Sequence, residues 1–97
     1  MLTHIVVWKY KPEVGEEQRR EHVARLRALA GLVPEIQSFA VGRDVLGLPR
    51  SYHTGLVATF RDRDALRAYD AHPEHQSVAQ LGRGISEHVA SVDFEDD

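Results

Sequence analysis

The chain has 97 residues, of which 42% are hydrophobic and 28% are charged, and its formal net charge is −3. This length allows one domain over residues 1–97, and the acidic balance argues against a nucleic-acid-binding protein, which usually shows a basic excess on one face. The absence of cysteine excludes disulfides, a thiolate nucleophile and cysteine zinc sites. The hydrophobic run over residues 5–8 is too short for a signal sequence or a membrane span, so we expect a soluble, cytoplasmic protein.

The N-terminal stretch predicts a β-strand. Residues 2–10 are rich in β-branched and aromatic side chains, which favour strands. Because side chains alternate along a strand, one face carries His4, Val6, Trp8 and Tyr10, and the other carries Thr3, Ile5, Val7 and Lys9. Both faces hold apolar side chains, so each needs a covering layer. In so short a chain we expect the second cover to come from another subunit.

A helix is predicted next, over residues 16–30. Acidic residues occupy its first turn, where the helix dipole favours them. Its apolar stripe, at helical spacing, consists of Val23, Leu26, Ala30 and Val33. Gly31 is expected to cap the helix and Pro34 to prevent its continuation. His22 lies at the edge of the stripe, where it either faces a cavity or makes a surface hydrogen bond.

The second half of the chain predicts a hairpin, two helices and a last strand. The expected elements are strands over 35–44 and 52–60, a helix from Asp62 or Asp64 through Tyr69, a short helix over 74–82 and a strand over 88–94. Gly82 and Gly84 are expected to loosen the chain between the last helix and the last strand.

This order of elements, β-α-β-β-α-β, is typical of the ferredoxin-like α+β fold. One antiparallel sheet then carries both helices on one face. The other face is left bare and, by the alternation of the first strand, apolar at Ile5 and Val7. Two copies that pack sheet against sheet would bury it. We therefore expect a homodimer that associates through the sheet faces and forms a dimeric α+β barrel.

The segment from Leu66 to His75 holds the residues best suited to chemistry. Leu66 and Tyr69 share a helical face, and Pro73, which lacks a backbone N–H, ends the helix at or just before His72. His75 lies past this break, where the chain can turn back toward Tyr69. At neutral pH an imidazole with an unperturbed pKa near ~6.5 can accept a proton, and a phenol near ~10 can donate a hydrogen bond.

The leading hypothesis is a cofactor-free acid–base enzyme that acts on a small, largely apolar carbonyl compound. Tyr69 and His75 are its predicted catalytic residues. The predicted substrate-binding residues are His4, Trp8, His22, Leu26, Leu56 and His72. A concave, mostly apolar cavity with a few converging polar groups is the usual form of such a site.

Three other interpretations stay open. In a non-catalytic accessory dimer, Tyr69, His72 and His75 would only stabilise the helix end, with His75 bonded to a carbonyl freed by Pro73. A metal could be held by His72, Glu74, His75 and His4, but Pro73 breaks the helical geometry in which two histidines share a metal, so no metal is predicted. By fold analogy alone, dimeric barrels of this topology include monooxygenases that act on quinol-like or haem substrates.

Five stretches of the sequence follow the pattern of one known family. They are residues 4–9 (HIVVWK), 41–44 (VGRD), 52–60 (YHTGLVATF), 65–75 (ALRAYDAHPEH) and 92–94 (VDF). With these stretches the chain resembles the stress-responsive A/B barrel (Dabb) family over nearly its whole length. The most specific part is Tyr-x-x-His-Pro-x-His over residues 69–75.

This resemblance implies a dimer whose two sheets close into a β-barrel. Most members of the family have no assigned reaction, but a plant polyketide cyclase among them closes a ring by an aldol-type step without a cofactor. The catalytic tyrosine and histidine of that cyclase fall on Tyr69 and His75, and its first-strand histidine falls on His4. Where the cyclase has bulky aromatics and a third-strand histidine, this chain has His22, Val23, Leu26 and Thr54. The resemblance therefore implies a differently shaped pocket and a different substrate.

Overall fold

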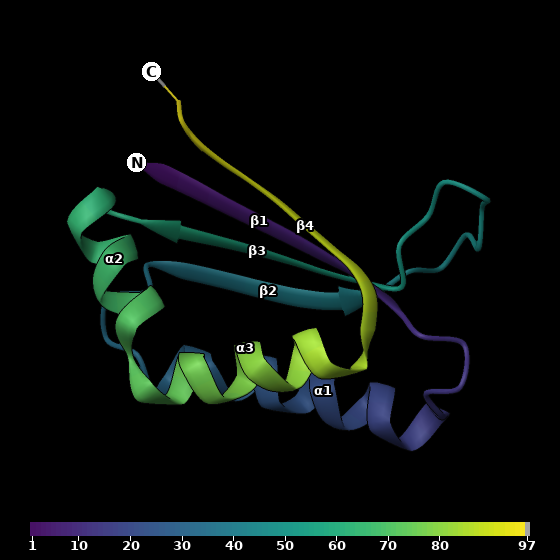
Figure 1. Ribbon diagram of the computed structural model, residues 1–97. Helices are drawn as coiled ribbons and strands as arrows, with labels where there is room; N and C mark the ends of the chain where they lie inside the picture. Colours follow the sequence, from purple (N-terminus) through teal and green to yellow (C-terminus); the bar gives the residue numbers. More distant parts are fainter. Residues whose placement is uncertain (97) are drawn as a thin grey trace.

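A computed structural model describes residues 1–96 as a four-stranded antiparallel sheet with helices packed on one of its faces (Figure 1). The elements, in chain order, are β1 (Leu2–Tyr10), α1 (Glu16–Ala28), a 3₁₀ turn η1 (Leu29–Gly31), β2 (Ser38–Arg43), β3 (Thr54–Phe60), α2 (Arg63–Ala71), α3 (Pro73–Ile85) and β4 (Ser86–Glu95). The strand order is β2-β3-β1-β4, so β1 is central and β4 is an edge strand. The predicted ferredoxin-like α+β fold is confirmed.

The predicted break between two helices is confirmed at Pro73. The side chain of Asp62 caps α2 by accepting a hydrogen bond from the N–H of Ala65 at 2.9 Å, so Asp62, rather than Asp64, is the cap. His72 leaves the helical conformation, with φ −63° and ψ 132°, as expected for the residue before a proline. Pro73 then begins α3, because a first helical residue needs no N–H partner.

Most element boundaries differ by one to three residues from the sequence prediction. The first helix ends at Ala28 and continues as the tighter turn η1 rather than reaching residue 30 as an α-helix. The expectation that Gly82 and Gly84 loosen the chain is wrong, since α3 runs through both to Ile85. Intrinsic propensity is weaker than tertiary packing, and α3 packs against α1 and leads directly into β4.

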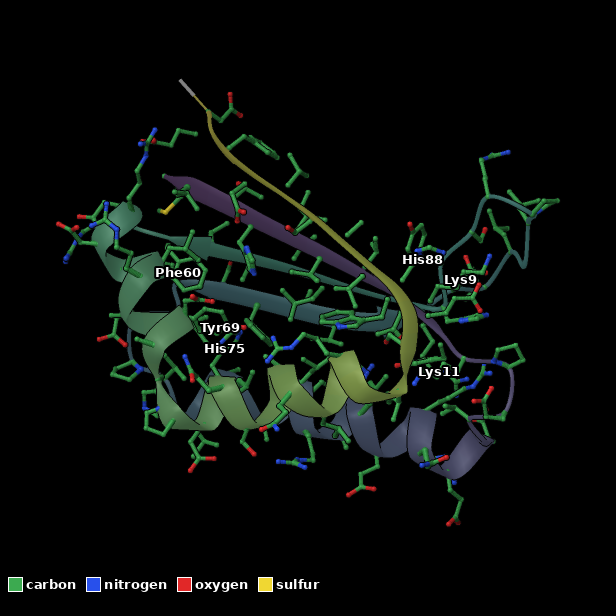
Figure 2. All side chains as sticks on the ribbon, viewed as in Figure 1. Lys9, Lys11, Phe60, Tyr69, His75 and His88 are labelled. Atoms are coloured by element: carbon green, nitrogen blue, oxygen red, sulfur yellow. The ribbon has the colours of Figure 1, made fainter. Side chains whose placement is uncertain are left out.

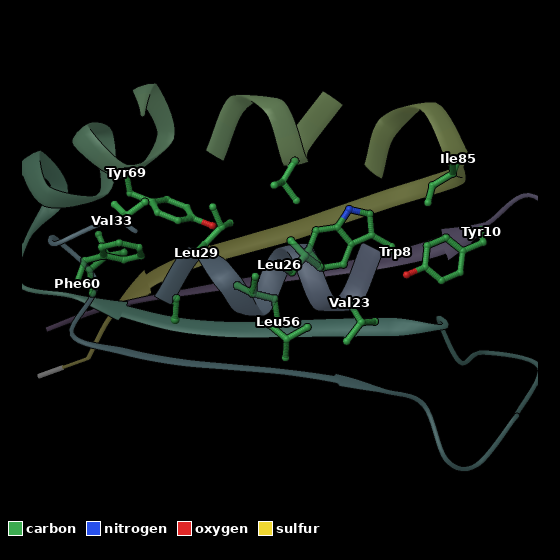
Figure 3. Close-up of a cluster of buried hydrophobic side chains, with 14 of the residues drawn as sticks. Trp8, Tyr10, Val23, Leu26, Leu29, Val33, Leu56, Phe60, Tyr69 and Ile85 are labelled. Carbon is green, nitrogen blue, oxygen red and sulfur yellow. The ribbon is translucent and has the colours of Figure 1, made fainter. Parts of the chain in front are cut away.

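The core lies between the sheet and the helices (Figure 3). Trp8 and Tyr10 point into it from β1, Leu26 and Leu29 from α1 and the turn after it, and Phe60 from β3, and each is at most 6% exposed. Burying aromatic and leucine side chains of this size supplies most of the stabilisation of a small domain. The helix-facing alternation predicted for β1 is therefore confirmed.

The other face of the sheet is open and apolar. In the register of the sheet, Ile5 lies between Val57 of β3 and Val92 of β4, and Thr3 lies opposite Phe94. Val57, Val92 and Phe94 are 43%, 53% and 44% exposed. Large apolar side chains gathered on one exposed face mark an interaction surface in a small protein. We call this set, Ile5, Val57, Val92 and Phe94, the open face.

Candidate functional site

A cavity of about 240 Å³ lies between the helix-facing side of the sheet and the helices α2 and α3. Its apolar wall comes from Val6 and Trp8 of β1, Leu26 of α1 and Leu56 of β3. Its polar groups at one end are His4, Tyr69 and His75. Three strands and three helices thus contribute side chains to one small space. It has few polar groups among apolar walls, which is the usual composition of a ligand site.

Tyr69 and His75 are packed against each other at the junction of α2 and α3. Their ring centroids are 4.3 Å apart, and Phe60 covers the other side of Tyr69 at 5.0 Å. Figure 2 shows the three rings together at one end of the layer between sheet and helices. Tyr69 is 2% exposed. Burial, with a smaller contribution from Asp70, raises the pKa of the Tyr69 hydroxyl well above its ordinary value, so this group stays a hydrogen-bond donor at neutral pH.

The hydrogen bonding of His75 determines which of its nitrogens is free. Nδ1 lies 3.0 Å from the backbone carbonyl oxygen of Asp70. A carbonyl only accepts, so Nδ1–H is the donor and carries the proton. Burial lowers the pKa of His75 below its ordinary value, although the hydrogen bond to Asp70 and the Asp70 charge oppose this shift. At neutral pH the ring is therefore neutral, and Nε2 keeps a lone pair that can accept a proton.

A second histidine, His4, is held by a carboxylate across two paired strands. Asp93 of β4 lies directly opposite His4 of β1 in the register, and its Oδ1 contacts Nδ1 of His4. The His4 ring meets Tyr69 edge-on at a centroid distance of 6.0 Å. A carboxylate that accepts from Nδ1–H fixes the ring orientation and leaves Nε2 as the nitrogen that can exchange a proton.

The structure does not place two of the predicted substrate-binding histidines in this cavity. His72 is the cap of α3, where its Nδ1 accepts a hydrogen bond from the N–H of Glu74 at 3.1 Å. His22 is wholly buried, so it does not make the surface hydrogen bond considered from the sequence. Its Nδ1 is 2.7 Å from the Tyr10 hydroxyl, which also bonds Thr54 Oγ1 at 2.8 Å.

His22 is a structural residue with one unused nitrogen. Its ring packs edge-on against Trp8 at 5.1 Å, on the far side of the cavity wall, and within residues 1–96 its Nε2 has no hydrogen-bond partner. Burial, with a smaller effect of Arg25, lowers the pKa of His22 to about 4. A histidine buried in this way is neutral in the folded protein and gains a proton on unfolding in weak acid.

We expect the free energy of unfolding to fall as the pH is lowered from about 6.5 to about 4, because only the unfolded chain binds the proton of His22 in this range. A shift from an ordinary ~6.5 to about 4 corresponds to a loss of up to about 3 kcal/mol. Urea unfolding of the wild type and of His22→Gln at pH 7.0 and 4.5 measures the effect. The variant should lose less stability than the wild type, and equal losses in both proteins would show that His22 does not cause it.

Several cavity residues were missed by the sequence prediction. They are Val6, Asp70, Ala79, Arg83, Val89 and Ser91, together with Asp93 beside His4. Val89, Ser91 and Asp93 alternate along the last strand, so pairing that strand with β1 could have revealed them. Arg83 was hidden because the helix was expected to end at residue 82. His75, Ala79 and Arg83 follow one another at four-residue spacing on α3.

A larger groove, of about 710 Å³, lies on the opposite side of the sheet. It is lined by Ile5, Val7 and Val57 and by the β2–β3 connection, and it contains no histidine. Of the two arginines that line it, Arg43 and Arg50, Arg43 is already paired with Glu16. Since this groove overlaps the open face, we assign it to that surface and place the candidate site in the smaller cavity.

No helix within residues 1–96 is both long and apolar enough to cross a membrane. The described residues also contain no group of three or more histidine and acidic side chains with the geometry of a metal site. The polar groups in and beside the cavity are a tyrosine, two histidines, their acidic neighbours, a serine and an arginine. Such a set can donate and accept protons at a bound organic molecule.

Comparison with known proteins agrees with this architecture. An uncharacterized protein from Streptomyces coelicolor is 29% identical over 98% of this chain and 99% of its own length. Olivetolic acid cyclase from Cannabis sativa is 25% identical over 96% of this chain and 94% of its own length. A dimeric ferredoxin-like protein of unknown function from Thermobifida fusca superposes with a TM-score of 0.88 at 25% identity, covering 96% of this chain and 88% of that one.

The family described as Stress responsive A/B Barrel Domain (Dabb) matches residues 2–96. This match includes every strand and helix and every residue of the cavity. The chain therefore belongs to the Dabb family.

Proposed function

We propose that this protein binds a small, largely apolar carbonyl compound in the cavity and catalyses cofactor-free acid–base chemistry on it, of the cyclase or lyase type. The observation that carries the proposal is the pair formed by Tyr69 and His75. A buried phenol that stays protonated packs 4.3 Å from an imidazole that stays neutral, at the polar end of an apolar cavity. One group can donate and the other can accept a proton at pH 7.

The proposed step is removal of a proton from the carbon next to the carbonyl group. Nε2 of His75 accepts this proton, the C–H electron pair forms a carbon–carbon double bond, and the carbonyl electrons move to its oxygen. The Tyr69 O–H donates a hydrogen bond to the resulting enolate oxygen, which stabilises the developing charge. The enolate then attacks a second carbonyl group of the same molecule, or takes back a proton from His75. His4, oriented by Asp93, supplies a second proton-exchanging nitrogen at this end of the cavity.

The comparisons support the reaction class rather than a particular substrate. One relative is named olivetolic acid cyclase. The family resemblance carried by the motif over residues 69–75 implies that the catalytic tyrosine and histidine of such a cyclase fall on Tyr69 and His75. Trp8 and Leu26, not a row of aromatic side chains from the first helix, form the wall of this cavity. We therefore propose the acid–base pair for this protein, but not the substrate of the cyclase.

We propose further that the protein is a homodimer formed through the open face. Structural relatives are described as dimeric, among them those from Thermobifida fusca and Jannaschia. The exposed side chains of Val57, Val92 and Phe94 need a cover, and two copies of the same apolar sheet face complement each other by symmetry.

Val57→Lys is expected to convert the dimer into a monomer, because it places a charge at the centre of the open face without touching the helix-facing core. Sedimentation velocity at micromolar concentration measures the change. Leu32→Lys is the matched control, since Leu32 is 49% exposed and follows η1 on the helical side. A monomeric wild type, or a dimer that survives Val57→Lys, would contradict the proposed interface.

A non-catalytic accessory protein is the second candidate, and a specific contact favours it. The bond from His75 Nδ1–H to the Asp70 carbonyl satisfies a backbone group near the end of α2, and His72 caps α3. Both histidines thus stabilise the helix junction, as they would in a protein without a reaction. The two candidates differ in whether Nε2 of His75 ever takes a proton from a ligand.

Deuterium exchange into a simple ketone tests the catalytic proposal. We expect the wild-type protein to accelerate exchange of the methyl protons of 4-acetylbenzamide in D₂O, followed by proton NMR, above the rate in buffer alone. The same samples show whether the ketone binds, through the shift of the indole N–H of Trp8, the single tryptophan. Binding without accelerated exchange would favour the accessory protein, and a ketone that does not bind would contradict the proposed ligand class.

A further inference from the structure

One charged side chain of the cavity has no part in the proposed step. Arg83 lies on the same stripe of α3 as His75 and Ala79, at eight residues from His75, and all three line the cavity. Eight residues of helix span roughly 12 Å along the axis, so the side chains of Arg83 and His75 leave the backbone of α3 at opposite ends of the cavity. The small side chain of Ala79 leaves the space between them open.

The guanidinium of Arg83 is free to bind a ligand. Within residues 1–96 the arginines that form ion pairs with acids are Arg20, Arg43, Arg61, Arg63 and Arg67, and Arg83 is not among them. Arg83 is exposed, on the turn of α3 beside Gly82, and an added Cβ at Gly82 would lie 2.9 Å from Trp8 Nε1. The side chain of Arg83 therefore leaves the backbone of α3 near the Trp8 end of the cavity.

The acids of the cavity lie at the opposite end. The Asp93 carboxylate contacts Nδ1 of His4, and the Asp70 carboxylate is 3.9 Å from Nδ1 of His75. An anionic group on a ligand would thus be repelled from the Tyr69 and His75 end and attracted to the Arg83 end. The charges along the cavity favour one orientation of a molecule with a single negative charge.

Building on the proposed function, we infer that the ligand is a small ring compound with a carbonyl group at one end and a carboxylate at the other. The carboxylate binds to the Arg83 guanidinium, whose planar fork matches its two oxygens. The ring lies against Trp8 and Leu56, and the carbonyl group meets Tyr69 and His75. A cavity of about 240 Å³ is smaller than the sites that hold drug-sized molecules, so one ring with short substituents is the expected size.

Two probes of equal shape and different charge test this inference. They are 4-acetylbenzoate and 4-acetylbenzamide, which differ only in a carboxylate against a carboxamide. Dissociation constants come from the indole N–H shift of Trp8 in low-salt buffer. We expect the wild type to bind the benzoate about tenfold more tightly, the size of an advantage from one charge-assisted pair at a partly exposed site. The preference should shrink at high salt.

Two variants test whether Arg83 causes the preference for 4-acetylbenzoate. Arg83→Gln should weaken binding of 4-acetylbenzoate about tenfold and binding of 4-acetylbenzamide far less, because the neutral amide loses only an uncharged acceptor's hydrogen bond. Arg20→Gln removes the same charge from an exposed position on α1 outside the cavity and should change neither constant. Since Arg83 is exposed and forms none of the ion pairs, its replacement leaves the fold intact.

Equal affinity of the wild type for the two probes would overturn the inference, and so would a preference that survives in Arg83→Gln. Either result, with 4-acetylbenzamide still bound and its methyl protons still exchanged, would leave the proposed function standing. If neither probe shifts the Trp8 indole N–H, the proposed ligand class fails and the inference about its charge fails with it.

Discussion

Replacement of His75 by alanine is expected to slow deuterium exchange into 4-acetylbenzamide by about two to four orders of magnitude, the usual contribution of a positioned general base. The reason is geometric. Nδ1 of His75 is held by the Asp70 carbonyl at 3.0 Å, so Nε2 is the basic nitrogen of the ring, and burial keeps it unprotonated at neutral pH. The exchange rate at saturating ketone is the measurement.

Tyr69→Phe is expected to reduce the same rate by about two to three orders of magnitude, because a lost hydrogen bond to an oxyanion costs about this much. Phenylalanine keeps the packing against Phe60 and His75 while removing the only hydrogen-bonding group of the ring. The affinity for the ketone should change far less than the rate, since the bond strengthens as charge develops on the oxygen.

His72→Ala is the matched control for both variants. It removes a histidine from the same segment, three residues from either member of the pair, but one whose side chain caps α3 outside the cavity. We expect a modest loss of thermal stability and an exchange rate within a few-fold of the wild type. An unchanged rate in His75→Ala would remove that residue from the chemistry and make His4, with Asp93, the next base to test.

Gly82→Ala and Gly84→Ala are expected to change stability in opposite directions. A Cβ at Gly82 would lie 2.9 Å from both His22 Nε2 and Trp8 Nε1, and both rings are buried. Overpacking of this kind costs about 1–3 kcal/mol, more than the gain of up to about 1 kcal/mol from replacing glycine in a helix. A Cβ at Gly84 meets nothing within 4 Å, so only the gain applies.

Thermal unfolding at equal protein concentration checks both changes. Each kcal/mol corresponds to about 4–8 °C in the Tm of a domain of this size, so Gly82→Ala should melt several degrees below the wild type and Gly84→Ala a few degrees above it. The Trp8 fluorescence of Gly82→Ala should also change, because its indole must move. Shifts of the same sign in both variants would mean that the contact at Gly82 is relieved without cost.

The sequence predicted the features of the fold that depend on local pattern. Alternation along residues 2–10 separated His4 and Trp8 from Ile5 and Val7, and Pro73 marked the junction that brings His75 back onto Tyr69. These signals act within a few residues of each other. They were enough to predict that Tyr69 and His75, the proposed acid–base pair, share one cavity with four predicted neighbours, His4, Trp8, Leu26 and Leu56.

The parts that could not be predicted depend on partners distant in the chain. Nothing near residue 82 reveals that α3 passes so close to Trp8 and His22 that only glycine fits there. The predicted helix therefore ended about one turn too early, and Arg83 was not predicted to line the cavity. The burial of His22 depends on Tyr10 and Thr54, which come from two different strands. Asp93 becomes a partner of His4 only through the pairing of the last strand with the first.

The strand β4 connects the proposed dimer interface with the candidate site. Asp93 lies on the helix-facing side of β4 and contacts His4, while its immediate neighbours Val92 and Phe94 belong to the open face. As an edge strand, β4 is secured by β1 on one side only. In the proposed dimer, the second copy packs against the open-face side chains of this strand. This contact restricts the motion of the strand and, with it, of the Asp93 carboxylate on its helix-facing side. We therefore expect the rate of the proposed reaction per subunit to fall when dilution separates the copies, and to rise with protein concentration until every subunit is paired.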